Sequence, residues 1–148
     1  MDTWSGALNA SWCATRVCEG SVAEVAMLLA SHGRTGARFM VPGAALELRG
    51  DVGAQAGVTP VAPARVHHAR VRYAPWMPAV RVTVEVDPWS NGRSEVLIRP
   101  ARRLPVARDR YLAASVALLD AVATELGLST VAPSAARVGG PDRLPRAS

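Results

Sequence analysis

Lysine is absent from the sequence, so all 17 basic side chains are arginines. Together with frequent alanine, glycine, proline and valine, this usage indicates a GC-rich genome that favours arginine codons. The net charge of +5 is compatible with a nucleic-acid partner, but the arginines are scattered and only Arg102 and Arg103 are adjacent. Because phosphate backbones are usually bound by a clustered basic stripe, this scatter argues against nucleic acid as a partner.

Cysteine and histidine are scarce as well. Cys13 and Cys18 lie five residues apart, and neither they nor the three histidines have a spacing known from metal sites. The sequence also lacks long apolar runs and a basic N-terminal segment followed by an apolar core, which argues against a membrane span and a secretory signal. We therefore expect a cytoplasmic protein that uses no metal or cofactor.

The 148 residues, of which 49% are hydrophobic and 20% charged, suit one globular domain. Near the start, an expected strand turns at Glu19-Gly20 into a helix. Ser21 and Glu24 have the spacing of a capping box, and Gly33 is the expected C-cap of this helix. We expect the domain to span residues 1–128, followed by a flexible tail at residues 129–148.

Alternation and helical periodicity predict the remaining elements. In the segment VRVTVEV, four valines share one face while Arg81, Thr83 and Glu85 share the other, as in a strand with one buried side. Asn91-Gly92 predicts a hairpin turn, and Gly127 should end a C-terminal helix that begins near residue 107. Residues 51–65, with several glycines and prolines, predict a loop. The expected strands span residues 7–17, 37–41, 45–49, 66–73, 80–86 and 94–99.

This order predicts an α+β fold in which a curved antiparallel sheet grips a long C-terminal helix, with a short helix after the first strand. Three segments, WCATRVCEGSVAEVAMLLA, VRVTVEVDPWSNGRSEVLIRP and RYLAASVALLDAVATEL, together resemble the START-like helix-grip superfamily (SRPBCC-type domains), which includes polyketide cyclases. The resemblance covers residues 5–127. It implies a central cavity for a small hydrophobic or aromatic molecule, and in some members cyclisation or dehydration of that molecule.

His67 and Tyr73 are the candidate catalytic residues. Alternation along residues 66–73 places both on the face that bears Val71, away from Arg70 and Arg72. A histidine near a tyrosine in a cavity could transfer a proton during cyclisation or dehydration. The alternative is a histidine that is hydrogen-bonded at the cavity wall for structural reasons alone.

Candidate ligand contacts come from apolar faces and from loops. Four tryptophans accompany one phenylalanine and two tyrosines, and we expect Trp76 and Trp89 in hairpin loops at the cavity mouth. Arg49 shares a face with Glu47, and cross-strand ion pairs on a wet sheet face explain both residues; if that face turned inward, Arg49 could instead hold a ligand carboxylate or phenolate. The remaining candidates lie on apolar strand faces: Trp12, Leu46, Leu48, Val71, Val82 and Val84.

Three functions follow as hypotheses. The first is binding of a small hydrophobic or aromatic molecule, with acid–base assistance of cyclisation or dehydration if the protein is an enzyme. The second is a carrier or sensor of the same fold that leaves its ligand unchanged. The third is a module that binds protein or nucleic acid through a sheet face bearing Arg70, Arg72 and Arg81. Ligand identity, catalysis and oligomeric state are left open by the sequence.

Overall fold

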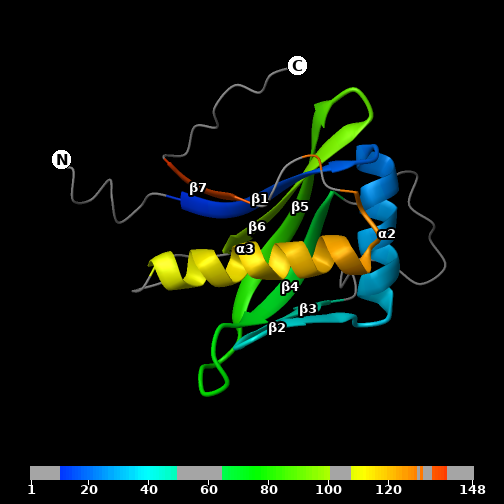
Figure 1. Cartoon of the computed structure of the whole chain (residues 1–148). Coiled ribbons are helices and arrows are strands. Elements are labelled where there is room, and N and C mark those ends of the chain that lie inside the picture. The colour runs from blue at the N-terminus through cyan, green and yellow to red at the C-terminus, as the bar shows by residue number, and fades with distance from the viewer. Residues whose placement is uncertain (1–10, 50–64, 101–107, 130, 132–134, 140–148) are drawn as a thin grey trace.

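The computed structural model describes residues 11–49, 65–100, 108–129, 131 and 135–139 (Figure 1). Within these ranges the strands form one antiparallel sheet with the order β2-β3-β4-β5-β6-β1-β7. The strands are β1 (Ser11–Glu19), β2 (Arg38–Val41), β3 (Ala44–Leu48), β4 (Val66–Arg72), β5 (Val80–Ser90), β6 (Arg93–Pro100) and β7 (Ala135–Gly139). The helices are α2 (Val22–Arg34) and α3 (Arg108–Glu125).

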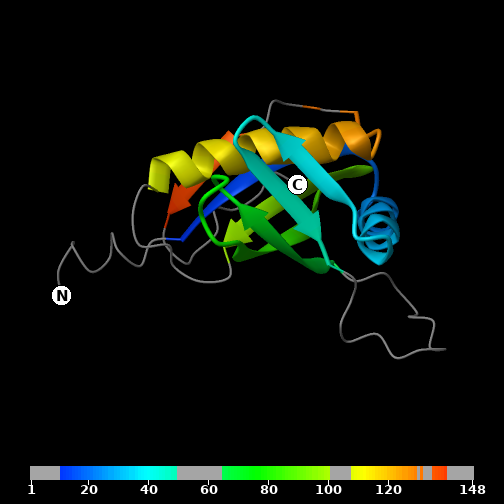
Figure 2. The ribbon, with the colours of Figure 1, turned by 90° about the horizontal axis from the view of Figure 1, so that it is seen from below.

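The sheet curls around α3, as Figure 2 shows. The helix contacts β1 and β2, which are separated in the sheet by four other strands, so it spans the opening between the two sides of the curl. Helix α2 stands at one end and contacts β4, β5 and β6 (Figure 1). The structure thus confirms the predicted α+β class and the curved antiparallel sheet, while α3, with 18 residues, is slightly shorter than predicted.

The core lies between the inner face of the sheet and the two helices. On β5, Val82, Val84 and Val86 are buried against the helices, whereas Arg81 and Thr83 face outward. This two-residue alternation is what allows one face of a strand to pack while the other meets water. The helices contribute apolar side chains to the same cluster, among them Val25, Leu29, Leu112, Leu118, Leu119 and Val122.

Helix α2 begins as predicted and ends differently. The Ser21 hydroxyl accepts a hydrogen bond from the Glu24 backbone N–H at 3.2 Å, which satisfies one of the free donors of the first turn. Gly33, predicted as the C-cap, is instead a buried residue of the last turn. A Cβ there would lie 3.3 Å from the Arg49 carbonyl oxygen, so glycine permits a close backbone approach.

Two further differences concern strands. β5 continues through Trp89 to Ser90, with a register irregularity between Pro88 and Ser90, so Trp89 lies in a strand and not in the predicted loop. A bulge of this kind lets a strand continue past a proline. β7 lies within residues 129–148, the predicted flexible tail, where it pairs with β1. The predicted loop at residues 51–65 and the first residues of the predicted strand 7–17 lie mostly outside the described ranges.

Candidate functional site

The apolar residues predicted to line a cavity belong to the core. Leu46, Leu48, Val71, Val82 and Val84 are at most 1% exposed and form one cluster with the side chains of α2 and α3. They therefore point inward, as the alternation predicted. In these positions their side chains pack the sheet against the helices.

The two predicted catalytic residues face inward but lie at opposite ends of β4. His67 is opposite Val84 near the start of the strand, and Tyr73 directly follows its last residue. Six residues of extended chain span about 20 Å. A direct proton transfer requires hydrogen-bond distance, so the structure does not bring this pair together.

Tyr73 instead takes part in a buried polar contact with α3. Its hydroxyl lies 2.9 Å from the Ser115 hydroxyl, and its ring centre is 4.8 Å from that of Tyr111. Burial raises the pKa of Tyr73 to about 12, because a phenolate in the core would lose its hydration. At neutral pH the Tyr73 hydroxyl keeps its proton, and its polar atom is satisfied within the core.

The remaining predicted ligand contacts do not converge on one place. Trp12 lies in β1 opposite Val138, and Trp89 is half-buried in β5. Trp76 lies in the turn between β4 and β5 and is 77% exposed. Arg49 is exposed directly after β3, where its backbone N–H donates to the His68 carbonyl at 3.0 Å, so it does not turn into the core.

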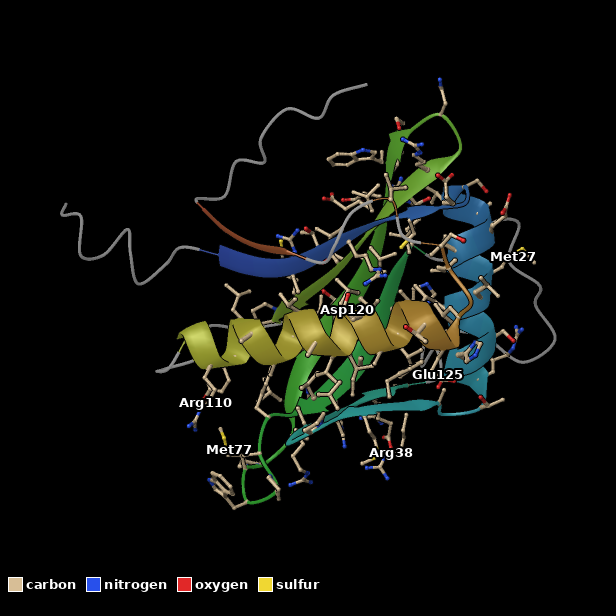
Figure 3. The ribbon with its side chains drawn as sticks, viewed as in Figure 1. Met27, Arg38, Met77, Arg110, Asp120 and Glu125 are labelled. Carbon is tan, nitrogen blue, oxygen red and sulfur yellow. The ribbon has the colours of Figure 1, made fainter. Side chains whose placement is uncertain are left out.

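Arginines gather on the outer face of the sheet, away from α3. Arg70 and Arg72 alternate with buried Ala69 and Val71 on β4, so their side chains share the outer side. Strand register places Arg81 of β5 directly opposite Arg70, and it places Arg38 of β2 in the same row, two strands from Arg70. Arg49, directly after β3, lies opposite His68 of β4, and all of these arginine side chains are exposed. We call this set the arginine face; it consists of Arg38, Arg49, Arg70, Arg72 and Arg81. Figure 3 shows Arg38 projecting from β2 on the side away from α3.

Within the arginine face, two like charges oppose each other directly. Arg70 on β4 is the register partner of Arg81 on β5. Glu47 lies between Arg70 and Arg38 on the adjacent strands, 3.9 Å from the Arg38 guanidinium. Like charges directly opposite each other destabilise a strand pair. One glutamate among five arginines, in the described part of the chain, leaves this face with a large positive excess.

Glu85 and Asp87, which also lie on the outer face of the sheet, bind arginines outside the arginine face. Arg99 donates to the Glu85 carboxylate at 3.1 Å, and Thr83 donates to the same carboxylate at 2.8 Å. Arg65 donates to Asp87 at 3.2 Å. Glu85 and Asp87 thus each bind an arginine, whereas the arginine face has an excess of positive charge.

An open groove of about 500 Å³ borders the arginine face between β2 and α3. Its helix side carries Asp120 and Glu125, and its strand side carries Arg38 and Phe39. The Asp120 carboxylate forms an ion pair with Arg16 of β1. The groove therefore has acidic residues on its helix side and Arg38 on its strand side.

Reasoning from the sequence identified part of this surface and missed its extent. The alternation of Arg70 and Arg72 is visible in the sequence, and Arg81 was expected on the same outer face. Arg38 lies on β2 and Arg49 directly after β3, and only the strand register reveals that they lie on the same face as Arg70. The arginines are far apart in the sequence but share one face of the sheet, because β2, β3, β4 and β5 lie side by side.

No group of three histidine, cysteine, aspartate or glutamate side chains suited to a metal occurs among the described residues. Neither described helix combines the length and the apolar character needed to cross a membrane. A comparison of the chain with protein-family models, curated proteins and solved structures found no match.

Proposed function

We propose that the protein binds a phosphate-bearing polymer through its arginine face. The observation that carries the proposal is the direct opposition of Arg70 and Arg81 on neighbouring strands. This arrangement weakens strand pairing, and a bound anion would relieve it. Surfaces that are unfavourable for stability are often maintained for binding.

The spacing of the arginines suits a polymer better than a single small anion. Adjacent strands are about 4.8 Å apart, so Arg38 on β2 and Arg81 on β5 have backbones roughly 14 Å apart across the sheet. Arg70 and Arg72 lie about 7 Å apart along one strand. Guanidinium groups bind phosphate through two parallel hydrogen bonds, and their weak hydration favours such contacts.

The proposal predicts a salt-dependent interaction with inorganic polyphosphate, measured by calorimetry over a series of salt concentrations. Arg70→Gln and Arg81→Gln should each weaken binding and lower the slope of log K against log salt by about one. Arg93→Gln is the matched control. Arg93 lies at the far end of β6, where its guanidinium donates to Glu19 at 3.2 Å.

Two outcomes would contradict the proposal. One is binding that does not respond to salt, which excludes phosphate contacts as its source. The other is an equal loss in Arg93→Gln and Arg81→Gln, which would mean that net charge and not the arginine face determines affinity.

The helix-grip assignment and its small-molecule function stay predictions. The position of α3 against β1 and β2 and the pairing of β1 with β6 support the assignment. The function has less support, because the residues expected around a ligand pack in the core and His67 lies far from Tyr73.

A further inference from the structure

Trp76 is the most exposed large hydrophobic residue of the described chain, at 77%. It lies in a turn closed by a hydrogen bond from the Met77 backbone N–H to the Ala74 carbonyl at 3.0 Å. Pro75 precedes it and restricts the backbone of the turn. An indole held in water on a constrained turn keeps a flat apolar face available for contact.

The turn is joined to the arginine face by Arg72. The Arg72 guanidinium donates to the backbone carbonyl of Met77, the residue next to Trp76. In the same row of the sheet, Arg72 is opposite Ala45, and Ala45 is opposite Met40, which is 70% exposed. One end of the arginine face therefore combines a guanidinium group with two exposed apolar side chains.

We propose that the polymer bound by the arginine face is a single-stranded nucleic acid, with one base stacked on Trp76. This inference rests on the proposed function and adds the chemistry of the ligand. Inorganic polyphosphate offers no flat group to an indole, and the bases of a duplex are stacked on one another. Single strands expose both phosphates and base faces, and proteins bind them by combining basic surfaces with aromatic platforms.

The arginines are scattered in the sequence, which by itself does not suggest a nucleic-acid partner. The sheet, however, places five of them on one face. The arginine face extends from β2 to β5, with Glu47 of β3 between Arg38 and Arg70, and Trp76 follows β4 at one of its ends. Stacking on an aromatic side chain tolerates any base, so we expect little sequence preference. A partner protein with acidic and apolar side chains could contact the same surface. The experiment distinguishes such a protein from a single-stranded nucleic acid.

The experiment measures fluorescence anisotropy of a labelled 20-nucleotide oligothymidylate, with a 20-base-pair duplex and inorganic polyphosphate as competitors. Trp76→Ala should weaken oligothymidylate binding about tenfold, within the range that loss of one stacked base produces. Polyphosphate binding should change less than twofold. Trp76→Phe should restore most of the affinity, since phenylalanine also stacks.

Met27→Ala is the matched control for loss of an exposed apolar side chain. Met27 is 61% exposed on α2, on the opposite side of the molecule from Met77 in Figure 3. This variant should bind oligothymidylate like the unaltered protein. Thermal melting of every variant confirms that the fold is kept.

Each contrary outcome has a distinct meaning. If Trp76→Ala binds oligothymidylate as well as the unaltered protein does, the stacking inference is refuted. If Arg81→Gln still weakens polyphosphate binding in that case, the proposed function of the arginine face stands. Equal weakening of oligothymidylate and duplex in Trp76→Ala also refutes stacking on a single strand. If the protein binds none of the three polyanions, both the proposed function and this inference fail, and an acidic protein becomes the partner to seek.

Discussion

Reversing one charge of the arginine face should stabilise the fold while it abolishes binding. Arg81 is directly opposite Arg70, and Glu47 is on the other side of Arg70. In Arg81→Glu, the repulsive pair becomes an attractive one. We expect the variant to unfold at a higher temperature than the unaltered protein and to lose its affinity for polyphosphate.

The size of the effect follows from Coulomb's law. Two unit charges about 7 Å apart in water interact by about 0.6 kcal/mol, so replacing repulsion by attraction changes stability by about 1.2 kcal/mol. At physiological ionic strength the screening length is about 8 Å, which reduces this change in stability to about 0.5 kcal/mol. For a chain of this size, the melting temperature should rise by about 2–5 °C at low salt and by about 1–2 °C at physiological salt.

The assay is thermal melting at several salt concentrations, followed by calorimetry with polyphosphate. Arg81→Gln removes the repulsion without adding attraction, so it should show about half of the stabilisation. The reasoning is refuted if neither variant is more stable than the unaltered protein at low salt. It is equally refuted if the difference in melting temperature does not shrink as salt increases.

Two further predictions concern stability alone. The pKa of Tyr73 is about 12 in the folded protein and about 10 in the unfolded chain. The protonated Tyr73 side chain therefore contributes fully to the free energy of unfolding below pH 10. This contribution, up to about 3 kcal/mol, is lost as the pH rises through 12. Urea unfolding at pH 9 and pH 11 should show about half of this loss, roughly 1.4 kcal/mol, and Tyr73→Phe should lack it; equal losses in both proteins would contradict the prediction. Gly92→Ala should cost about 1 kcal/mol in the same assay, because Gly92 has a φ of +67° and no atom lies near its missing Cβ. A neutral result would mean that the β5–β6 turn relaxes to another conformation.

The sequence predicted the elements whose signals are local. Alternating valines identified β5, Ser21 with Glu24 identified the start of α2, and Asn91-Gly92 identified the hairpin turn, which has Gly92 in the left-handed region. Each signal depends on a few neighbouring residues, and so tertiary contacts were not needed to interpret it.

Other features depend on contacts between distant segments. The role of Gly33 is set by the Arg49 carbonyl, and β7 is a strand because it pairs with β1. The inward orientation of His67 and Tyr73 could be predicted, but their separation follows from the length of β4. The arginine face depends on the register of four strands, which the amino-acid pattern of any one strand does not contain.

The position of β1 between β6 and β7 has a consequence for the order in which the protein folds. Glu19 and Arg93, which pair through their side chains, are 74 positions apart, and Arg16 and Asp120 are 104 positions apart. The antiparallel strands β2 to β5 pair with their neighbours in sequence, whereas β1 has no described partner strand until β6 is synthesised. Such long-range pairing slows folding, because a large loop must close before the contact is gained. The first of the described strands to leave the ribosome, β1, is thus among the last to join the sheet.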